Sequence, residues 1–207
     1  MRVITLNNEA LEEHASRLAG MVAADGCRFD AIVGVRRGGS IVCDSFCRYF
    51  PSAKYGFRAD VSLQRPSTKK KGGLVSKFLK KLPYWMLNLM RMAESGLLEW
   101  KNRRSARQSV RESVHKVDLP DYLMSLSKEK DIPKILIIDD AIDSGRTLSV
   151  IINSLKKMNP KVHTKVAVIT ETTPSPCLRA DYTIYRDRTL IRFPWSNDYK
   201  KPKGLHS

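Results

Sequence analysis

Hydrophobic and polar positions along this chain fall into alternating blocks that predict strands and helices in turn. Apolar residues recur at helical spacing, with Asn8 as the expected N-cap of the first helix, in residues 9–24, 40–50 and 147–158. Short apolar runs rich in Val and Ile, typical of buried strands, occupy residues 29–35, 54–61, 134–138, 164–170 and 181–185. The alternation predicts a doubly wound, mostly parallel α/β sheet that binds its ligand at the carboxyl ends of the strands.

The strand at residues 134–138 runs into a segment suited to a sugar phosphate. Asp139 and Asp140 follow it, and ionised carboxylates accept hydrogen bonds from vicinal hydroxyls. Residues 143–147, Asp-Ser-Gly-Arg-Thr, then form a small-residue loop that opens the next helix. Backbone N–H groups at a helix N-terminus, together with two hydroxyls, suit a phosphate. The alternative is an ordinary buried strand followed by an acidic loop.

A second glycine-rich turn follows the strand at residues 29–35. Arg36 and Arg37 bring positive charge to it, while Gly38 and Gly39 allow the backbone to approach a ligand closely. On its own, such a turn is more often a solvated loop. Paired with the acidic segment downstream, it is interpreted as a second anion-binding loop.

Three segments resemble the type I phosphoribosyltransferases. Residues 135–147, Ile-Leu-Ile-Ile-Asp-Asp-Ala-Ile-Asp-Ser-Gly-Arg-Thr, are similar to the family's phosphoribosyl pyrophosphate (PRPP) signature, with Ser144 where threonine is usual. Residues 30–40 resemble its pyrophosphate loop. Residues 181–185 and 190–195, which end in Phe-Pro-Trp, resemble the hood of the purine enzymes that use xanthine, guanine and hypoxanthine.

The resemblance implies an Mg²⁺-dependent enzyme that transfers the phosphoribosyl group of PRPP to a nitrogenous base, with a purine expected, and releases pyrophosphate. Asp139 and Asp140 would hold the ribose hydroxyls and would contact Mg²⁺ mainly through substrate and water. Asp143 would be the acid/base group beside the purine imidazole nitrogen. The 5′-phosphate would be held by Ser144, Gly145, Arg146 and Thr147. The leaving pyrophosphate would contact Arg36, Arg37, Gly38 and Gly39.

The base pocket departs from the family pattern. Relatives carry a lysine that reads the oxygen on C6 of the purine, and here Thr172 stands at about that position. Leu190 stands where many relatives place the aromatic residue that stacks on the base. Leu190 and Trp195 are the substrate-binding candidates from the hood. The identity of the base therefore stays open.

A basic segment, residues 62–130, is expected to be a mostly helical insertion between two halves of the core, residues 1–61 and 131–207. Residues 65–116 carry fourteen Lys or Arg against three Glu, a net +11 of the chain's +16. Such charge attracts nucleic acid, although a solvated helical face is the more common explanation. The candidate contacts to nucleic acid or a protein partner are Lys69, Lys70, Lys71, Arg103, Arg104, Arg107 and Arg111.

Residues 74–98 within this segment mix apolar side chains with lysines and contain Pro83, too polar and interrupted a pattern to span a bilayer. Packing on the chain's own core or on a second subunit is expected, with an anionic membrane or a partner groove as the alternative. A homo-oligomer is expected.

The alternative function is a regulator on the same fold. Such a protein would sense PRPP or a nucleotide while its basic segment binds nucleic acid or a protein. Asp143 and the two-arginine turn favour catalysis, whereas the altered base pocket and the basic segment favour the regulator.

The four cysteines and the N-terminal residues indicate a reducing compartment. The cysteines form no Cys-x-x-Cys pair and are expected to be apolar thiols rather than metal ligands. The N-terminal residues lack the apolar run of a signal peptide, so a cytoplasmic protein is expected.

Overall fold

The structure, a computed structural model, describes residues 2–35, 37–50, 57–63, 82–83, 86–93, 96, 117–129, 132–186 and 188–200. The candidate contacts at residues 69–71, 103–104, 107 and 111 lie outside the described residues, as does Arg36.

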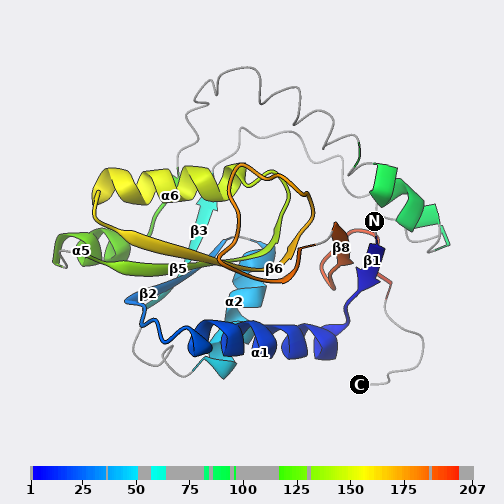
Figure 1. Cartoon of the computed structure of the whole chain (residues 1–207), viewed down its shortest axis with the longest axis horizontal. Coiled ribbons are helices and arrows are strands. Elements are labelled where there is room, and N and C mark those ends of the chain that lie inside the picture. The colour runs from blue at the N-terminus through cyan, green and yellow to red at the C-terminus, as the bar shows by residue number, and fades with distance from the viewer. Residues whose placement is uncertain are drawn as a thin grey trace, which may run out of the picture.

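A six-stranded sheet in the order β4-β3-β2-β5-β6-β7 forms the centre of the fold (Figure 1). Its parallel strands are β2 (Ala31–Val35), β3 (Phe57–Leu63), β5 (Lys134–Ile142), β6 (His163–Glu171) and β7 (Tyr182–Tyr185). The short strand β4 (Val117–Asp118) pairs antiparallel with β3 at the edge. The predicted mostly parallel α/β sheet is therefore confirmed.

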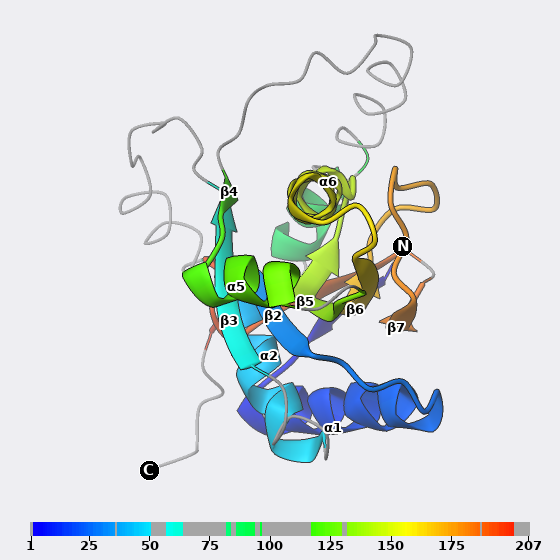
Figure 2. The ribbon, with the colours of Figure 1, turned by 90° about the vertical axis from the view of Figure 1, so that its left-hand side faces the viewer.

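Helices cover both faces of the sheet because its central strand buries side chains in both directions. Leu136 and Ile138 of β5 pack in one apolar cluster with α1 (Asn8–Ala24) and α2 (Gly38–Tyr49). Ile135 and Ile137 point the other way, into a second cluster with α5 (Asp121–Glu129) and α6 (Arg146–Met158). Figures 1 and 2 show α5 and α6 on one side and α1 on the other.

A small second sheet joins segments that are far apart in the chain. Strand β1 (Arg2–Thr5) pairs in parallel with β8 (Thr189–Arg192). Helical residues 86–93 lie beside this pair (Figure 1). Strands β1 and β8, with the residues that follow β8, form the hood, here defined as residues 2–5 and 189–200.

A buried ion-pair network fixes residues 86–93 to the hood. Arg192 is only 1% exposed and donates to Asp198 at 2.9 Å, Thr5 at 2.9 Å and Asn88 at 2.8 Å. Arg91 donates two hydrogen bonds, of 2.8 and 2.6 Å, to the same carboxylate of Asp198. Because Asn88 and Arg91 both belong to the basic segment, this part of it packs on its own fold, as expected. Among the described residues, no helix is both long enough and apolar enough to cross a bilayer.

Several predicted boundaries were wrong. Strand β5 continues to Ile142, because β6 runs beside it as far as Glu171, so Asp139 and Asp140 lie within the strand rather than after it. The N-cap of α1 is Asn7, whose side-chain oxygen accepts from the backbone N–H of Ala10 at 2.8 Å, rather than Asn8.

The predicted helix at residues 40–50 begins two residues earlier, at Gly38. Of the predicted strand at residues 54–61, residues 57–61 lie in β3, which continues to Leu63, and residues 54–56 lie outside the described residues. The sequence pattern did not predict the short strands β1, β4 and β8, whereas α5 falls within residues 62–130, which were predicted to be mostly helical.

We expect Asp198→Asn to lower the free energy of unfolding at pH 7 by about 3 kcal/mol, because it leaves Arg192 buried without its carboxylate. Burial raises the pKa of Asp198, but hydrogen bonds from Arg91 and Arg192 outweigh burial, so its pKa lies below the ordinary value. A carboxylate with a lowered folded pKa stabilises above its unfolded pKa of about 3.9, and that stability is lost as the pH falls through the folded pKa.

Urea unfolding of wild type and Asp198→Asn at pH 7 and again near pH 3 would therefore show that the difference in their free energies of unfolding is smaller in acid. Glu9→Gln, at an exposed position on α1, is the matched control and should change little. Equal stability of Asp198→Asn and wild type at pH 7 would contradict this reading of the network.

Candidate functional site

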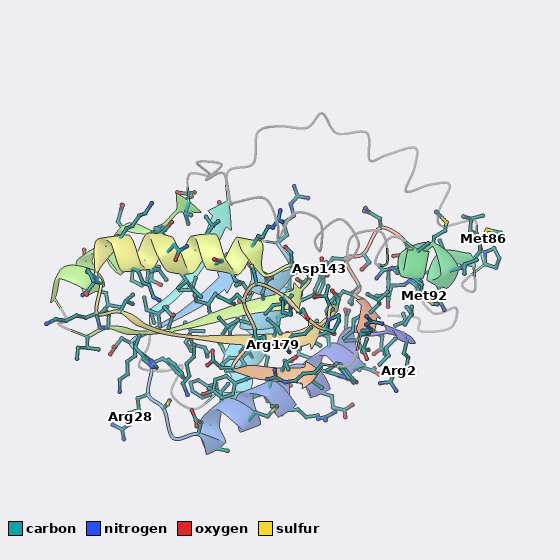
Figure 3. The ribbon with its side chains drawn as sticks, turned by 45° about the horizontal axis from the view of Figure 1, so that its top comes forward. Arg2, Arg28, Met86, Met92, Asp143 and Arg179 are labelled. Atoms are coloured by element: carbon teal, nitrogen blue, oxygen red, sulfur yellow. The ribbon has the colours of Figure 1, made fainter. Side chains whose placement is uncertain are left out.

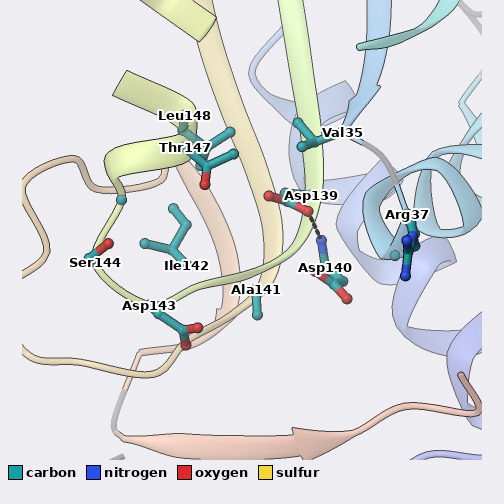
Figure 4. A pocket seen from close by; sticks show the side chains of 12 residues that line it. Val35, Arg37, Asp139, Asp140, Ala141, Ile142, Asp143, Ser144, Thr147 and Leu148 are labelled. Atoms are coloured by element: carbon teal, nitrogen blue, oxygen red, sulfur yellow. Dashed lines mark hydrogen bonds between the residues drawn. The ribbon is translucent and has the colours of Figure 1, made fainter. Parts of the chain in front are cut away.

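The two predicted loops meet at the point where the strand order reverses. From β2 the chain adds β3 and β4 on one side, and from β5 it adds β6 and β7 on the other. Ligands of open α/β sheets bind at such a switch point, beyond the carboxyl ends of the strands. A cavity of about 290 Å³ lies there (Figure 4). Its lining comes from Val35, Arg37, Gly38, residues 139–145, Thr147 and Leu148.

Two adjacent carboxylates form one wall of the cavity. A side-chain oxygen of Asp139 accepts a hydrogen bond from the backbone N–H of Asp140 at 2.9 Å, the dashed line in Figure 4. Burial raises the pKa of Asp139 well above its ordinary value, and the neighbouring charge of Asp140 raises it further. Burial likewise raises the pKa of Asp140. The pair is therefore poised to accept hydroxyl donors or a cation, either of which would favour the ionised form.

The glycine turn approaches this pair too closely to carry side chains. A Cβ on Gly38 would lie 1.9 Å from Oδ2 of Asp140 and 2.8 Å from Nε1 of Trp195. A Cβ on Gly39 would lie 2.7 Å from the carbonyl oxygen of Ile138. Gly38 lines the cavity and Gly39 is buried against β5, so the two glycines let the N-terminus of α2 face the carboxylates.

The loop before α6 forms the opposite end of the cavity. Gly145 has φ of +77°, and a Cβ there would lie 2.8 Å from the backbone of Leu178. Ser144, Gly145 and Thr147 line the cavity beside the N-terminus of α6. This arrangement places hydroxyls and the positive end of the helix dipole at an anion-sized space. Arg146, also predicted to contact phosphate, is exposed and is not among the residues that line the cavity.

Asp143 is an exposed residue of the same loop. Figure 3 shows it near the middle of the view, between Arg28, which precedes β2, and the helix that carries Met86 and Met92. Its side chain accepts a hydrogen bond of 2.5 Å from the Thr172 hydroxyl. Thr172 follows β6, at the position where the sequence comparison expected a lysine. The structure therefore brings Asp139, Asp140, Asp143 and the glycine turn to one cavity.

Of the two residues predicted from the hood, Trp195 bonds to a carboxylate of the cavity wall, although it is not itself among the residues that line the cavity. The indole N–H of Trp195 donates to Oδ2 of Asp140 at 3.1 Å, and its ring stacks on Phe193 at 4.8 Å between centroids. Leu190 instead lies buried in β8 opposite Val3 and is not among the residues that line the cavity.

The sequence did not single out Thr173 or Cys177, which donate to carbonyls of the loop before α6. Nor did it single out Glu171, which bonds to Arg179 and Ala180 at the far end of the loop after β6. Thr173 and Glu171 stand among ordinary strand-end residues, and no motif marks them. Only the spacing of Thr172 from the signature indicated this region.

Asp139 and Asp140 are the groups best placed to hold a hard cation, which prefers oxygen ligands. Within the described ranges, no three His, Cys, Asp or Glu residues converge to form a complete metal site.

Residues 5–200 match the family model described as the phosphoribosyl transferase domain. The fold is similar to that of a purine phosphoribosyltransferase from Pyrococcus horikoshii, with 18% identity over 100% of both chains and a TM-score of 0.55. It is also similar to the xanthine-guanine-hypoxanthine phosphoribosyltransferase of Helicobacter pylori, with 15% identity over 94% of both chains and a TM-score of 0.55. A hypothetical protein from Neisseria gonorrhoeae with bound ppGpp gives 14% identity, 94% and 89% coverage and a TM-score of 0.54. No curated protein matches the chain.

We expect Asp139→Asn to stabilise the cation-free protein at neutral pH, because a carboxylate no longer has to ionise in the cavity. A carboxyl whose folded pKa is raised retains its proton longer in the folded protein, so stability falls as the pH rises from about 4 through the folded pKa. The gain in unfolding free energy should be roughly 1 kcal/mol or more at pH 7.5 and should disappear near pH 4.

Denaturant unfolding of wild type and Asp139→Asn in the presence of a chelator measures the gain in unfolding free energy at pH 7.5 and near pH 4. A variant that is less stable than wild type at pH 7.5 would contradict the raised pKa.

Proposed function

Because this chain belongs to the phosphoribosyl transferase domain family, we propose that it is an Mg²⁺-dependent enzyme that transfers the phosphoribosyl group of PRPP to a nitrogenous base and releases pyrophosphate. The observation that carries the proposal is the convergence of Asp139, Asp140, Asp143 and the glycine turn on one cavity at the switch point. The purine enzymes among its structural neighbours support a purine as the base.

Each wall of the cavity suits one part of PRPP. Asp139 and Asp140 would accept hydrogen bonds from the ribose 2′ and 3′ hydroxyls. Ser144, Gly145 and Thr147 would hold the 5′-phosphate at the N-terminus of α6. Arg37 and the Gly38 backbone, at the start of α2, would contact the pyrophosphate.

The crowded carboxylates also fit a hard cation. Mg²⁺, held by Asp139 and Asp140 mainly through substrate and water, would neutralise part of the pyrophosphate charge. The protein's own contribution is then positioning and charge stabilisation as the anomeric carbon becomes positively charged. Asp143 would accept the proton from the attacking nitrogen of the base, or orient that nitrogen by a hydrogen bond.

The alternative within the same fold is a sensor of PRPP or a nucleotide. A structural neighbour that holds ppGpp supports a guanine nucleotide as a ligand worth testing. The acid/base position of Asp143 favours catalysis, since a sensor has less need of such a group.

Calorimetric titration of PRPP with Mg²⁺ into wild type should give micromolar binding, which the Asp139→Asn, Asp140→Asn double variant should lose because both diol acceptors are weakened. Asp143→Asn should retain binding but reduce kcat, measured by pyrophosphate release with guanine, hypoxanthine and xanthine, by about 100-fold. ppGpp is titrated alongside.

Binding of PRPP without turnover of any base would favour the sensor. Wild-type PRPP affinity in the double variant would remove the diol role, and unchanged kcat in Asp143→Asn would remove the acid/base role.

The basic segment gives the protein a second proposed role. We propose that residues 62–130 act as an insertion between the two halves of the core and bind a polyanion, nucleic acid first, through Lys69, Lys70, Lys71, Arg103, Arg104, Arg107 and Arg111. The support is the net +11 charge of residues 65–116. Strand β4 and α5, which fall within residues 62–130, pack on the main sheet. They would be the part of the insertion that leads the chain back to the core.

A gel shift with single- and double-stranded RNA and DNA should show binding that weakens steeply as salt rises from about 50 to 200 mM. Replacing the seven candidate basic residues with Gln should abolish the shift and leave PRPP binding intact. The absence of any shift at low salt would disprove the nucleic-acid role.

We further expect a cytoplasmic homo-oligomer. Cys27, Cys43, Cys47 and Cys177 are all thiols rather than disulfides, which is consistent with a reducing compartment.

A further inference from the structure

The loop that follows β6, residues 172–181, is bound directly to the loop that carries Asp143. The backbone N–H of Thr172 donates to the carbonyl of Ile142 at 2.9 Å. The hydroxyl of Thr173 donates to the carbonyl of Asp143 at 3.1 Å, and the N–H of Cys177 donates to the carbonyl of Ser144 at 2.9 Å. Three successive carbonyls, from the last residue of β5 into the loop before α6, are therefore held by one neighbouring loop.

The Thr172 hydroxyl also holds the side chain of Asp143. Its oxygen lies 2.5 Å from Oδ1 of Asp143 and 3.3 Å from the carbonyl of Ile142. A hydroxyl has a single proton to donate, and the shorter contact falls in the range of charge-assisted bonds between a hydroxyl and a carboxylate. The proton is therefore assigned to Asp143. Thr172 is buried, and its branched Cβ restricts rotation, so the hydroxyl is a fixed anchor.

Without such an anchor, Asp143 would have little to fix its side chain. It is an exposed residue on a turn, and an exposed carboxylate samples several rotamers. The bond from Thr172 selects one of them and occupies Oδ1. Within the described part of the chain, no protein group donates a hydrogen bond to Oδ2, which is thus the oxygen available to a ligand.

The residue before Thr172, Glu171, has a buried carboxylate that joins the two ends of the loop after β6. Glu171 is fully buried; one of its oxygens accepts from the backbone N–H of Ala180 at 2.8 Å and the other from Arg179 at 3.2 Å. Arg186 lies 3.5 Å from the first oxygen. Glu171 thereby joins the two ends of the 172–181 loop. This fixes the backbone position from which the Thr172 side chain bonds to Asp143.

We propose that Thr172 is a positioning residue for the transfer reaction: its hydroxyl holds Oδ1 of Asp143 so that Oδ2 faces the nitrogen of the incoming base. The inference rests on the proposed function, because it assumes that Asp143 handles the proton. It assigns to Thr172 a role in turnover and none in PRPP affinity, since Thr172 does not line the cavity.

The test compares Thr172→Val, which removes the hydroxyl but keeps the shape, with Thr172→Ser, which keeps the hydroxyl. Thr183→Val is the matched control, because Thr183 is also buried and its hydroxyl donates to the carbonyl of Tyr185, within β7, at 3.2 Å. Turnover is measured by pyrophosphate release from PRPP with guanine, hypoxanthine and xanthine.

Thr172→Val should lower kcat about 10-fold and leave KM for PRPP within about two-fold, because correct orientation rather than binding is lost. Thr172→Ser should recover most of the rate, and Thr183→Val should match wild type. Wild-type kcat in Thr172→Val, or no recovery in Thr172→Ser, would overturn the proposal.

A double-mutant cycle separates this proposal from the function on which it rests. Once Asp143→Asn has removed the carboxylate, adding Thr172→Val should cost no further rate, whereas independent, additive losses would overturn the coupling. If Asp143→Asn alone leaves kcat unchanged, the acid/base role of Asp143 fails. If Asp143→Asn is impaired and Thr172→Val is not, only the present inference fails.

Crystal structures of wild type and Thr172→Val give a readout that does not depend on turnover. Asp143 should adopt one rotamer in wild type and several in Thr172→Val. A single unchanged rotamer in the variant would overturn the proposal even if none of the three bases is a substrate.

Discussion

The crowding of two carboxylates at the end of β5 constrains the rest of the site. Asp139 and Asp140 are adjacent in an inner strand, and their pKa values are raised because water has limited access to them. The turn facing them must be glycine, since a Cβ on Gly38 would overlap Asp140. Trp195 must reach across from the hood to donate to the same carboxylate. The shape of the cavity thus follows from enclosing this acidic pair between the glycine turn and the hood.

The sequence predicted the central fold and most of the cavity because both depend on local patterns. Val- and Ile-rich runs identified the parallel strands, and the acidic and glycine segments are contiguous in the chain. What it missed depends on contacts between distant segments. The strands β1 and β8 are four residues each and, among the described strands, pair only with one another. Strand β5 extends through Asp139 and Asp140 because β6 lies beside it, a fact of register that β5's own residues do not reveal.

The loop after β6 illustrates a different limit of sequence analysis. Thr172 attracted notice only as a departure from a lysine, whereas in the structure its hydroxyl bonds to Asp143. The acidic side chain of Glu171 is completely buried. Its hydrogen-bond partners, Arg179 and Ala180, lie eight and nine residues further along the chain. A set of hydrogen bonds of this kind leaves no periodic pattern in the sequence. Each of its polar residues is also typical of a surface loop.

The hood joins the two ends of the described chain. Thr5 and Arg192, which bond directly, are separated by 187 positions. A ribosome synthesising this protein therefore releases β1 long before its partner strand exists, and the loops of the cavity emerge before Trp195 can cover them. The acidic pair therefore leaves the ribosome before the hood residue that bonds to it, and the hood is the last part of the described fold that can assemble.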